Sequence, residues 1–214
     1  WDLKRSEVND FVSQGERIIL PRLIDAVQDG INALHTNPWW FGTDISDAFH
    51  QIPLRPAERK FTATLFQGVY YIFSVLVFGS GSAPTVWGRY AAFIGRSSAA
   101  ILEPLSASMQ IFVDDPLYTL PGPRPRAEQA ATVATMWLSV LGFPLAWHKT
   151  EAGQSIVWIG AELCFVPGGV SVTVPEDKVS AISMAMADIQ SKTVVPRKHF
   201  QKLAGRINFV AGLV

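Results

Sequence analysis

The chain has 214 residues, of which 49% are hydrophobic and 17% are charged. These proportions support one large buried core, alone or with a small appendage, and argue against a disordered chain. The formal net charge is zero, with 18 Lys and Arg against 18 Asp and Glu, so overall charge does not indicate a nucleic-acid binder. Positive charge is nevertheless concentrated at one end, because no acidic residue follows Asp188.

The first residues show neither an initiating Met nor a charged-then-apolar signal segment, so we expect a cut through a longer protein. The longest apolar run, residues 69–78, is too short to cross a bilayer, and we expect no membrane partner. A single cysteine, Cys164, excludes an internal disulfide framework and a multi-cysteine zinc site. It suits a reducing, intracellular compartment.

The first half of the chain predicts two helices and three strands. In chain order these are a helix over 20–34, a strand over 39–45, a strand pair over 61–66 and 69–76, and a helix that begins at Pro84. Pro21 is acceptable in the first turn of the first helix. The short turn Gln67-Gly68 joins the strand pair, and a loop rich in Gly and Ser precedes the second helix.

The second half begins with two apolar runs, 109–113 and 117–120, around Asp114-Asp115-Pro116. This pattern predicts a hairpin with two carboxylates at its tip. The remaining predicted elements are a helix over 127–141 closed by Gly142, strands over 156–165 and 170–174, and helices over 176–190 and 197–213. Helices alternate with antiparallel hairpins, so we predict an α+β fold.

Three carboxylates follow apolar segments: Asp44 comes after Trp39-Trp40-Phe41, and Asp114 and Asp115 come after Ile111-Phe112-Val113. Carboxylates beside buried strands are costly unless they are paired or bind a metal. A pair of divalent ions prefers oxygen ligands and catalyses phosphoryl transfer. Asp44 and Asp114 are therefore candidate bridging ligands, with Asp115 in support. On spacing alone, a turn cap and a polar hairpin tip explain these residues equally well.

Five motifs resemble, in order, those of the palm of retroelement reverse transcriptases. They are TDISDAFHQIPL (Thr43–Leu54), LVFGSGSAP (Leu76–Pro84), FVDD (Phe112–Asp115), LGFPLAWHKT (Leu141–Thr150) and VWIGAEL (Val157–Leu163). The flanking DLKRSEVN and LAGRINFVAGL are similar to segments of long-terminal-repeat or tyrosine-recombinase elements. The resemblance implies a polymerase palm with partial fingers over 1–165. It implies a primer-grip exit with thumb-like helices over 166–214.

The resemblance also implies roles for single residues. Asp44, Asp114 and Asp115 match the ligands of two Mg²⁺ ions, with Mn²⁺ as a possible substitute, and Lys149 matches the lysine proposed to protonate the leaving pyrophosphate. Phe49 matches the aromatic gate against the ribose 2′-hydroxyl. Phe78 and Gly79 match family residues that line the nucleotide pocket. Trp158, Ile159 and Gly160 match residues that hold the primer end. Taken singly, these would be ordinary core, surface and turn residues.

The last predicted helix has two faces. Lys198, Lys202 and Arg206 form a basic stripe, and Phe200, Leu203, Ile207 and Val210 form an apolar stripe opposite. A helix with one packed and one basic face could follow the backbone of a nucleic-acid duplex, as a thumb helix does. A solvated face is the other interpretation.

The implied function is an RNA-directed DNA polymerase that uses deoxynucleoside triphosphates, a primer and an RNA or DNA template, within a polyprotein with flanking domains. Two departures from the family stand out. Pro116 replaces the usual aliphatic residue, removes a backbone donor and restricts Asp115. The fingers Lys and Arg that grip the triphosphate would lie upstream of Trp1. A degenerate remnant that only binds nucleic acid, or another palm-type enzyme such as a nucleotidyl cyclase, remain alternatives.

Overall fold

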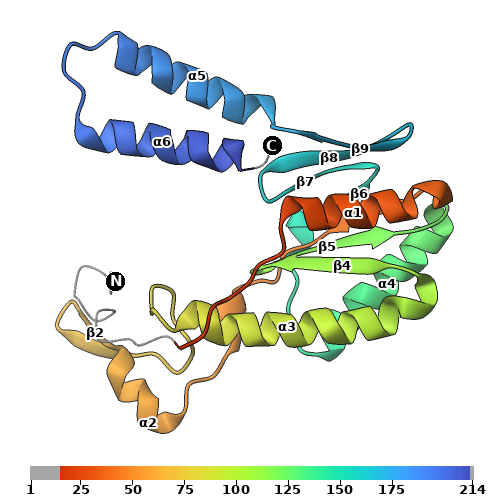
Figure 1. The fold of residues 1–214 in the computed structure, drawn as a ribbon. Coiled ribbons are helices and arrows are strands. Elements are labelled where there is room, and N and C mark those ends of the chain that lie inside the picture. The colour runs from red at the N-terminus through yellow and green to blue at the C-terminus, as the bar shows by residue number, and fades with distance from the viewer. Residues whose placement is uncertain (1–14, 213–214) are drawn as a thin grey trace.

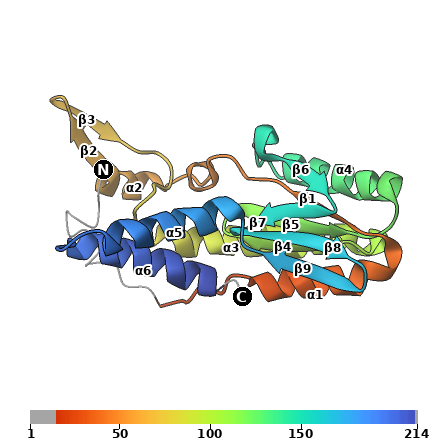
Figure 2. The ribbon, with the colours of Figure 1, turned by 90° about the horizontal axis from the view of Figure 1, so that it is seen from above.

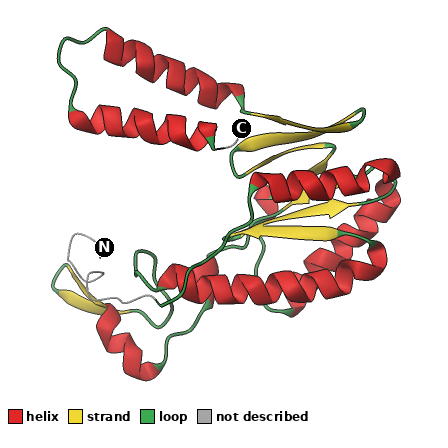
Figure 3. Cartoon of the chain, viewed as in Figure 1, coloured by secondary structure: helices red, strands yellow, loops and turns green. Residues whose placement is uncertain are grey.

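A computed structural model describes residues 15–212 of the chain (Figure 1). The helices are α1 (Leu23–Ala33), α2 (Pro56–Arg59), α3 (Ala83–Leu102), α4 (Arg124–Val140), α5 (Glu176–Gln190) and α6 (Arg197–Ala211). The strands are β1 (Trp39–Gly42), β2 (Ala63–Phe66), β3 (Val69–Ile72), β4 (Ser108–Phe112), β5 (Asp115–Leu120), β6 (Glu151–Gly153), β7 (Ser155–Trp158), β8 (Ala161–Val166) and β9 (Gly169–Thr173). Figure 3 separates helices from strands, and the predicted α+β fold is confirmed.

The central sheet has the strand order β4-β5-β1-β6, and its neighbouring strands are antiparallel. Side chains alternate along β1, because Trp40 belongs to one core cluster and Phe41 to another. The Trp40 face is covered by α1 and the sheet β7-β8-β9, and the Phe41 face by α3 and α4 (Figures 1 and 2). The sheet that carries the acidic hairpin is thus buried on both faces.

The two sheets meet at Trp40, whose ring is fully buried and stacks on Phe165 of β8 with centroids 4.4 Å apart. Helix α1 packs on this pair through Leu23, Ala26, Val27 and Gly30, at the spacing of one helical face. Gly30 makes the close approach possible. A Cβ there would lie 2.7 Å from Trp40 Cη2 and 2.9 Å from Val170 Cγ2.

The hairpin β2–β3 forms a separate two-stranded sheet that projects from one end of the molecule (Figure 2). Its turn is Gln67-Gly68, as predicted, and both residues have positive φ (50° and 77°). Two positive φ values are typical of the type I′ turn that matches strand twist. Most of the side chains of this hairpin are exposed, including Phe66 and Tyr70.

Several predicted boundaries differ from the structure. The predicted strand over 156–165 is two strands, β7 and β8, because the chain turns at Ile159-Gly160 inside a continuous apolar run. The first helix begins at Leu23, so Pro21 precedes the helix and is not in its first turn. The strand over 39–45 ends at Gly42, and Ile45 lies beyond it in an isolated bridge to Leu145. Within residues 15–212, no helix is long and apolar enough to cross a membrane.

We expect Gly30→Ala to lower the free energy of unfolding by ~1–3 kcal/mol, because the rigid Trp40 ring leaves no room for a Cβ. Gly205→Ala is the matched control, since a Cβ at this helical position would meet nothing within 4 Å. Gly205→Ala should raise the free energy of unfolding by up to ~1 kcal/mol, because alanine has a higher helix propensity than glycine. Urea unfolding measures both, and equal stability of Gly30→Ala and the wild type would contradict the packing described.

Candidate active site

The segment after β1 joins β5 edge to edge and brings Asp44 to the acidic hairpin. The Thr43 N–H donates to the Pro116 carbonyl at 3.2 Å, and the Ile45 N–H donates to the Asp114 carbonyl at 2.9 Å. These two bonds flank Asp44 and place it opposite Asp115 in the antiparallel register. The backbone therefore brings Asp44 beside Asp114 and Asp115, as expected if Asp44 and Asp114 are bridging ligands.

The tip of the hairpin is the two-residue turn Val113-Asp114, because Phe112 pairs with Asp115 across it. The prediction placed Asp114-Asp115-Pro116 at the tip, and this is wrong, since only Asp114 lies in the turn and Asp115 and Pro116 belong to β5. Val113 has φ +58°, and a positive φ at the first turn position is typical of a type II′ turn. A β-branched residue in this conformation is strained.

Lys149 neutralises Asp44 in this arrangement. It ends the 3-10 turn Trp147–Lys149, and its Nζ lies 3.0 Å from both Oδ1 and Oδ2 of Asp44. The Asp44 side chain is only 17% exposed, whereas that of Lys149 is 56% exposed. The hydrogen bond to Asp44, and then its negative charge, raise the pKa of Lys149. The Lys149 ammonium therefore stays protonated at neutral pH.

Two of the three carboxyl groups resist ionisation. Burial, and then the negative charges of Asp44 and Asp114, raise the pKa of Asp115 to about 6. Burial also raises the pKa of Asp114, with a contribution from Asp44. The three carboxylates thus lie close enough to repel one another, and one lysine does not cancel their charge. This electrostatic environment favours an added cation.

The carboxylates suit a divalent cation in their chemistry, since hard cations take carboxylate oxygens. Both oxygens of Asp44 already face one positive charge, that of Lys149. In the part of the chain that the structure describes, no group of three or more His, Cys, Asp or Glu side chains is gathered tightly enough to hold a metal ion. A cation at this position would have to displace Lys149 and draw the carboxylates closer.

Pro116 is fully buried in β5, between β4 and the segment after β1. Its carbonyl accepts a bond from the Thr43 N–H, but proline has no N–H to return a bond to Thr43. The expected loss of a donor is confirmed. Asp115 is extended within β5, which is the conformation that a following proline favours. Pro116 therefore removes one ladder bond and keeps the hairpin conformation.

Phe49 lies in the 3-10 turn Ala48–Gln51, and its ring is only 8% exposed. It packs between Phe78 and Trp87, with centroid distances of 4.8 and 6.1 Å. Phe78 is the exposed ring of the pair, at 54%. Gly79 follows with φ +87°, and a Cβ there would meet nothing within 4 Å, so its backbone conformation rather than crowding favours glycine.

Ile159 and Gly160 form the β7–β8 turn, and the buried Trp158 ends β7 directly before it. The Trp158 indole N–H donates to the Asp115 carbonyl at 3.2 Å, which joins this turn to the acidic hairpin. The Gly160 carbonyl accepts a 2.8 Å bond from Lys178 Nζ on α5. The sequence did not single out Lys178, and its only signal was a basic residue in the first turn of a predicted helix.

The basic stripe Lys198, Lys202 and Arg206 is exposed along α6. Lys202 and Arg206 border a hollow of about 490 Å³ between α5 and α6, and Arg206 donates to the Ala181 carbonyl at 3.4 Å. The opposite, apolar stripe is only partly packed, since Leu203 and Val210 are half-buried and Ile207 is exposed. Within the described residues α5 and α6 bury no side chain fully, because they pack chiefly on each other, and Phe200 stays 53% exposed.

We expect Asp115→Asn to stabilise the metal-free chain at pH 7 by ~1 kcal/mol, a value that allows for partial exposure of the carboxyl group. The folded pKa of about 6 lies above the ordinary 3.8, so ionisation of Asp115 costs stability as pH rises through this window. The advantage of Asn should be full above pH 6 and vanish below about pH 4. Urea unfolding against pH tests this, with the exposed Glu103→Gln as control. A pH-independent difference would contradict it.

Residues 7–163 match the family model of reverse transcriptase (RNA-dependent DNA polymerase). No curated protein sequence matches the chain. Among solved structures, the foamy viral protease-reverse transcriptase in complex with RNA/DNA hybrid has 17% identity and a TM-score of 0.65, covering 97% of this chain and 25% of that one. The same viral protein in complex with dsDNA has 15% identity and a TM-score of 0.61, covering 95% and 38%. This chain thus spans well under half of the proteins it resembles. Likeness at such identity shows the fold, and the family match covers more than half of the sequence: the chain belongs to the reverse transcriptase family.

Proposed function

We propose that the chain belongs to an RNA-directed DNA polymerase. Residues 1–165 would form the palm with partial fingers, and residues 166–214 the primer-grip exit with thumb-like helices. The polymerase would add deoxynucleotides to a primer 3′ end by two-metal phosphoryl transfer. The observation that carries the proposal is the convergence of Asp44 with Asp114 and Asp115 under Lys149, in a chain of this family.

Reverse transcriptases generally use divalent metal ions, and we propose two Mg²⁺ ions, replaceable by Mn²⁺, on Asp44, Asp114 and Asp115. When bound, such ions would activate the primer 3′-hydroxyl and offset charge on the triphosphate. Asp44 and Asp114 would hold both ions, with Asp115 in support. Lys149, released from Asp44, would still be protonated at neutral pH as an ordinary lysine is, and would donate a proton from Nζ to the leaving pyrophosphate.

The remaining site residues would bind the substrates. Phe49 and Phe78 would border the sugar of the incoming nucleotide, with Gly79 allowing the backbone to come close. The segment Trp158-Ile159-Gly160 would hold the primer end, since the Trp158 indole already joins it to Asp115. The exposed stripe Lys198, Lys202 and Arg206 would contact phosphates of the duplex.

The proposed partners are a primer on an RNA or DNA template, and deoxynucleoside triphosphates. The related viral protein was solved in complex with RNA/DNA hybrid and with dsDNA, which supports a duplex partner. That protein extends well beyond the matched part, which supports flanking domains in a polyprotein. A remnant that binds nucleic acid without turnover is the second candidate, and Pro116 favours it, since the proline weakens the ladder that joins the two acidic segments.

We expect Asp44→Asn and Asp114→Asn to reduce metal-dependent primer extension by on the order of 10³-fold or more, because several kcal/mol of transition-state stabilisation depend on the metal ions. Asp188→Asn, at an exposed position on α5, is the control and should be neutral. Extension is measured with Mg²⁺ and with Mn²⁺, on the chain and on the longer protein that we expect to contain it. Duplex binding without extension in either metal would support the remnant instead.

We expect Phe49→Ala to raise the ratio of ribonucleotide to deoxynucleotide incorporation, because the removed ring would no longer exclude a 2′-hydroxyl. The ring is largely buried, so this change should also lower stability by ~3–5 kcal/mol, and unfolding must be measured beside incorporation. Phe78→Ala separates the two rings. If only Phe78→Ala changes the ratio, the gate is Phe78, and Phe49 is a core residue that supports it.

A further inference from the structure

We propose that Trp87 is a positioning residue for the catalytic turn: its indole N–H holds the Val113 carbonyl and thereby the strained turn that presents Asp114 and Asp115. The inference deepens the proposed function and rests on it for its catalytic consequence. The geometric part, that Trp87 holds this turn, is independent of catalysis.

The hydrogen bond from the Trp87 indole to the Val113 carbonyl is short, and the position of the indole is fixed by its neighbours. Trp87 lies near the beginning of α3, is 1% exposed, and places its Nε1 2.7 Å from the Val113 carbonyl oxygen. Two rings fix the indole: Phe143 meets it at 86° with centroids 6.0 Å apart, and Phe49 lies 6.1 Å away. A buried indole N–H without an acceptor is costly, so bond and ring position support each other.

The turn has reason to need such a bond. Val113 combines a β-branched side chain with φ +58°, and strained residues persist only where the surroundings hold them. Three successive carbonyls, those of the two turn residues and of the first residue of β5, are each held from a different part of the chain. Trp87 of α3 bonds Val113, the Ile45 N–H bonds Asp114, and Trp158 of β7 bonds Asp115. Asp114 thus lies between two backbone positions that are fixed by indoles.

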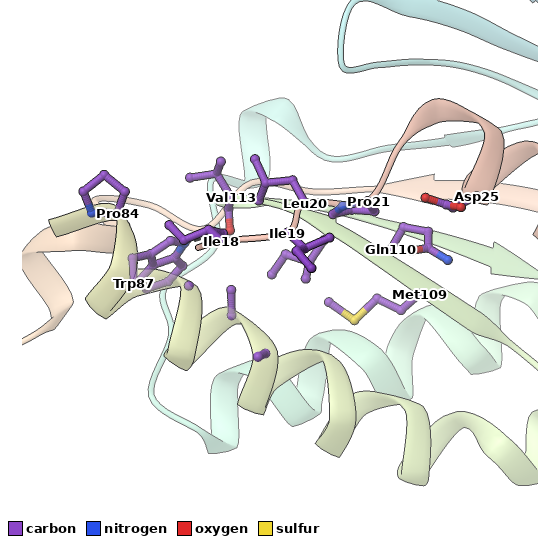
Figure 4. A pocket seen from close by; sticks show the side chains of 14 residues that line it. Ile18, Ile19, Leu20, Pro21, Asp25, Pro84, Trp87, Met109, Gln110 and Val113 are labelled. Carbon is purple, nitrogen blue, oxygen red and sulfur yellow. Dashed lines mark hydrogen bonds between the residues drawn. The ribbon is translucent and has the colours of Figure 1, made fainter. Parts of the chain in front are cut away.

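Packing alone leaves the turn incompletely supported. A cavity of about 430 Å³, with a largely apolar lining, lies between α3, β4 and the segment that precedes α1. Figure 4 shows Trp87, Val113 and Ile18 close together at the end of this cavity where α3 begins. Open space beside Val113 cannot restrain its backbone. The hydrogen bond from Trp87 therefore restrains the Val113 backbone, whereas close packing restrains the backbone elsewhere in the sheet.

Trp87→Phe isolates the hydrogen bond, because phenylalanine keeps an aromatic ring in the core and has no N–H. Trp137→Phe is the matched control. Its indole donates to Ser97 Oγ at 3.1 Å and joins α4 to α3, away from the turn. Val113→Gly is the rescue, because glycine adopts a positive φ without strain, and the turn then has less need of the indole.

The first measurement is amide hydrogen exchange of Ile45 without metal, since the Ile45 N–H bonds the Asp114 carbonyl. Trp87→Phe should accelerate this exchange about tenfold beyond any change in global stability, as expected for one hydrogen bond. Trp137→Phe should not. Adding Val113→Gly to Trp87→Phe should restore slow exchange. Equal exchange in Trp87→Phe and the wild type overturns the inference, whether or not the chain polymerises.

The second measurement is single-nucleotide incorporation in the protein that extends a primer. Trp87→Phe should lower kcat about tenfold and leave the Kd for primer–template unchanged, with recovery in the Val113→Gly double variant. A fall in stability with unchanged kcat would mean that Trp87 is only a core residue, and the inference fails. If Trp87→Phe accelerates exchange but the wild type extends no primer, Trp87 holds the turn and the polymerase proposal is what fails.

Discussion

The antiparallel contact between the segment after β1 and strand β5 determines the rest of the site. Two backbone bonds, from Thr43 to Pro116 and from Ile45 to Asp114, place Asp44 opposite Asp115. Without this register, the carboxylates would lie on unrelated parts of the chain. The helices α1, α3 and α4 and the second sheet bury both faces of the central sheet, and so keep the two acidic segments in one plane.

Several features that cost folding stability lie at this same contact. Burial and mutual repulsion raise the pKa of Asp114 and Asp115, Val113 is strained, and Pro116 cannot complete the ladder. Lys149 offsets part of the charge by binding both oxygens of Asp44. Charge repulsion and backbone strain in one part of a core are typical of a functional site. A region selected for stability alone would avoid both. This reasoning supports the catalytic interpretation of a motif whose acidic pair alone is a weak signal.

Sequence reasoning predicted the order of most elements and the members of the acidic site, because hydrophobic periodicity, Gly and Pro act locally. The turn Gln67-Gly68 was found from its glycine, and the helix at Pro84 from its proline. Features that depend on distant partners were not predicted. The pairing of β4 with β5 places the hairpin tip at Val113-Asp114 and not at Asp114-Asp115-Pro116, and no local signal marks a valine at positive φ. The indole bond of Trp87 and the contact of Lys178 with Gly160 join residues far apart in the chain, and so does the Asp44–Lys149 ion pair.

The most direct test is a crystal structure of the chain with Mn²⁺, in which anomalous scattering locates the ions. The account predicts ions between the carboxylates of Asp44 and Asp114, with oxygen–metal distances of ~2.0–2.6 Å and Lys149 displaced from Asp44. Val113 should keep its positive φ, since the hydrogen bond from Trp87 to its carbonyl does not depend on the ions. Ions bound elsewhere, with Lys149 still on Asp44, would contradict the account.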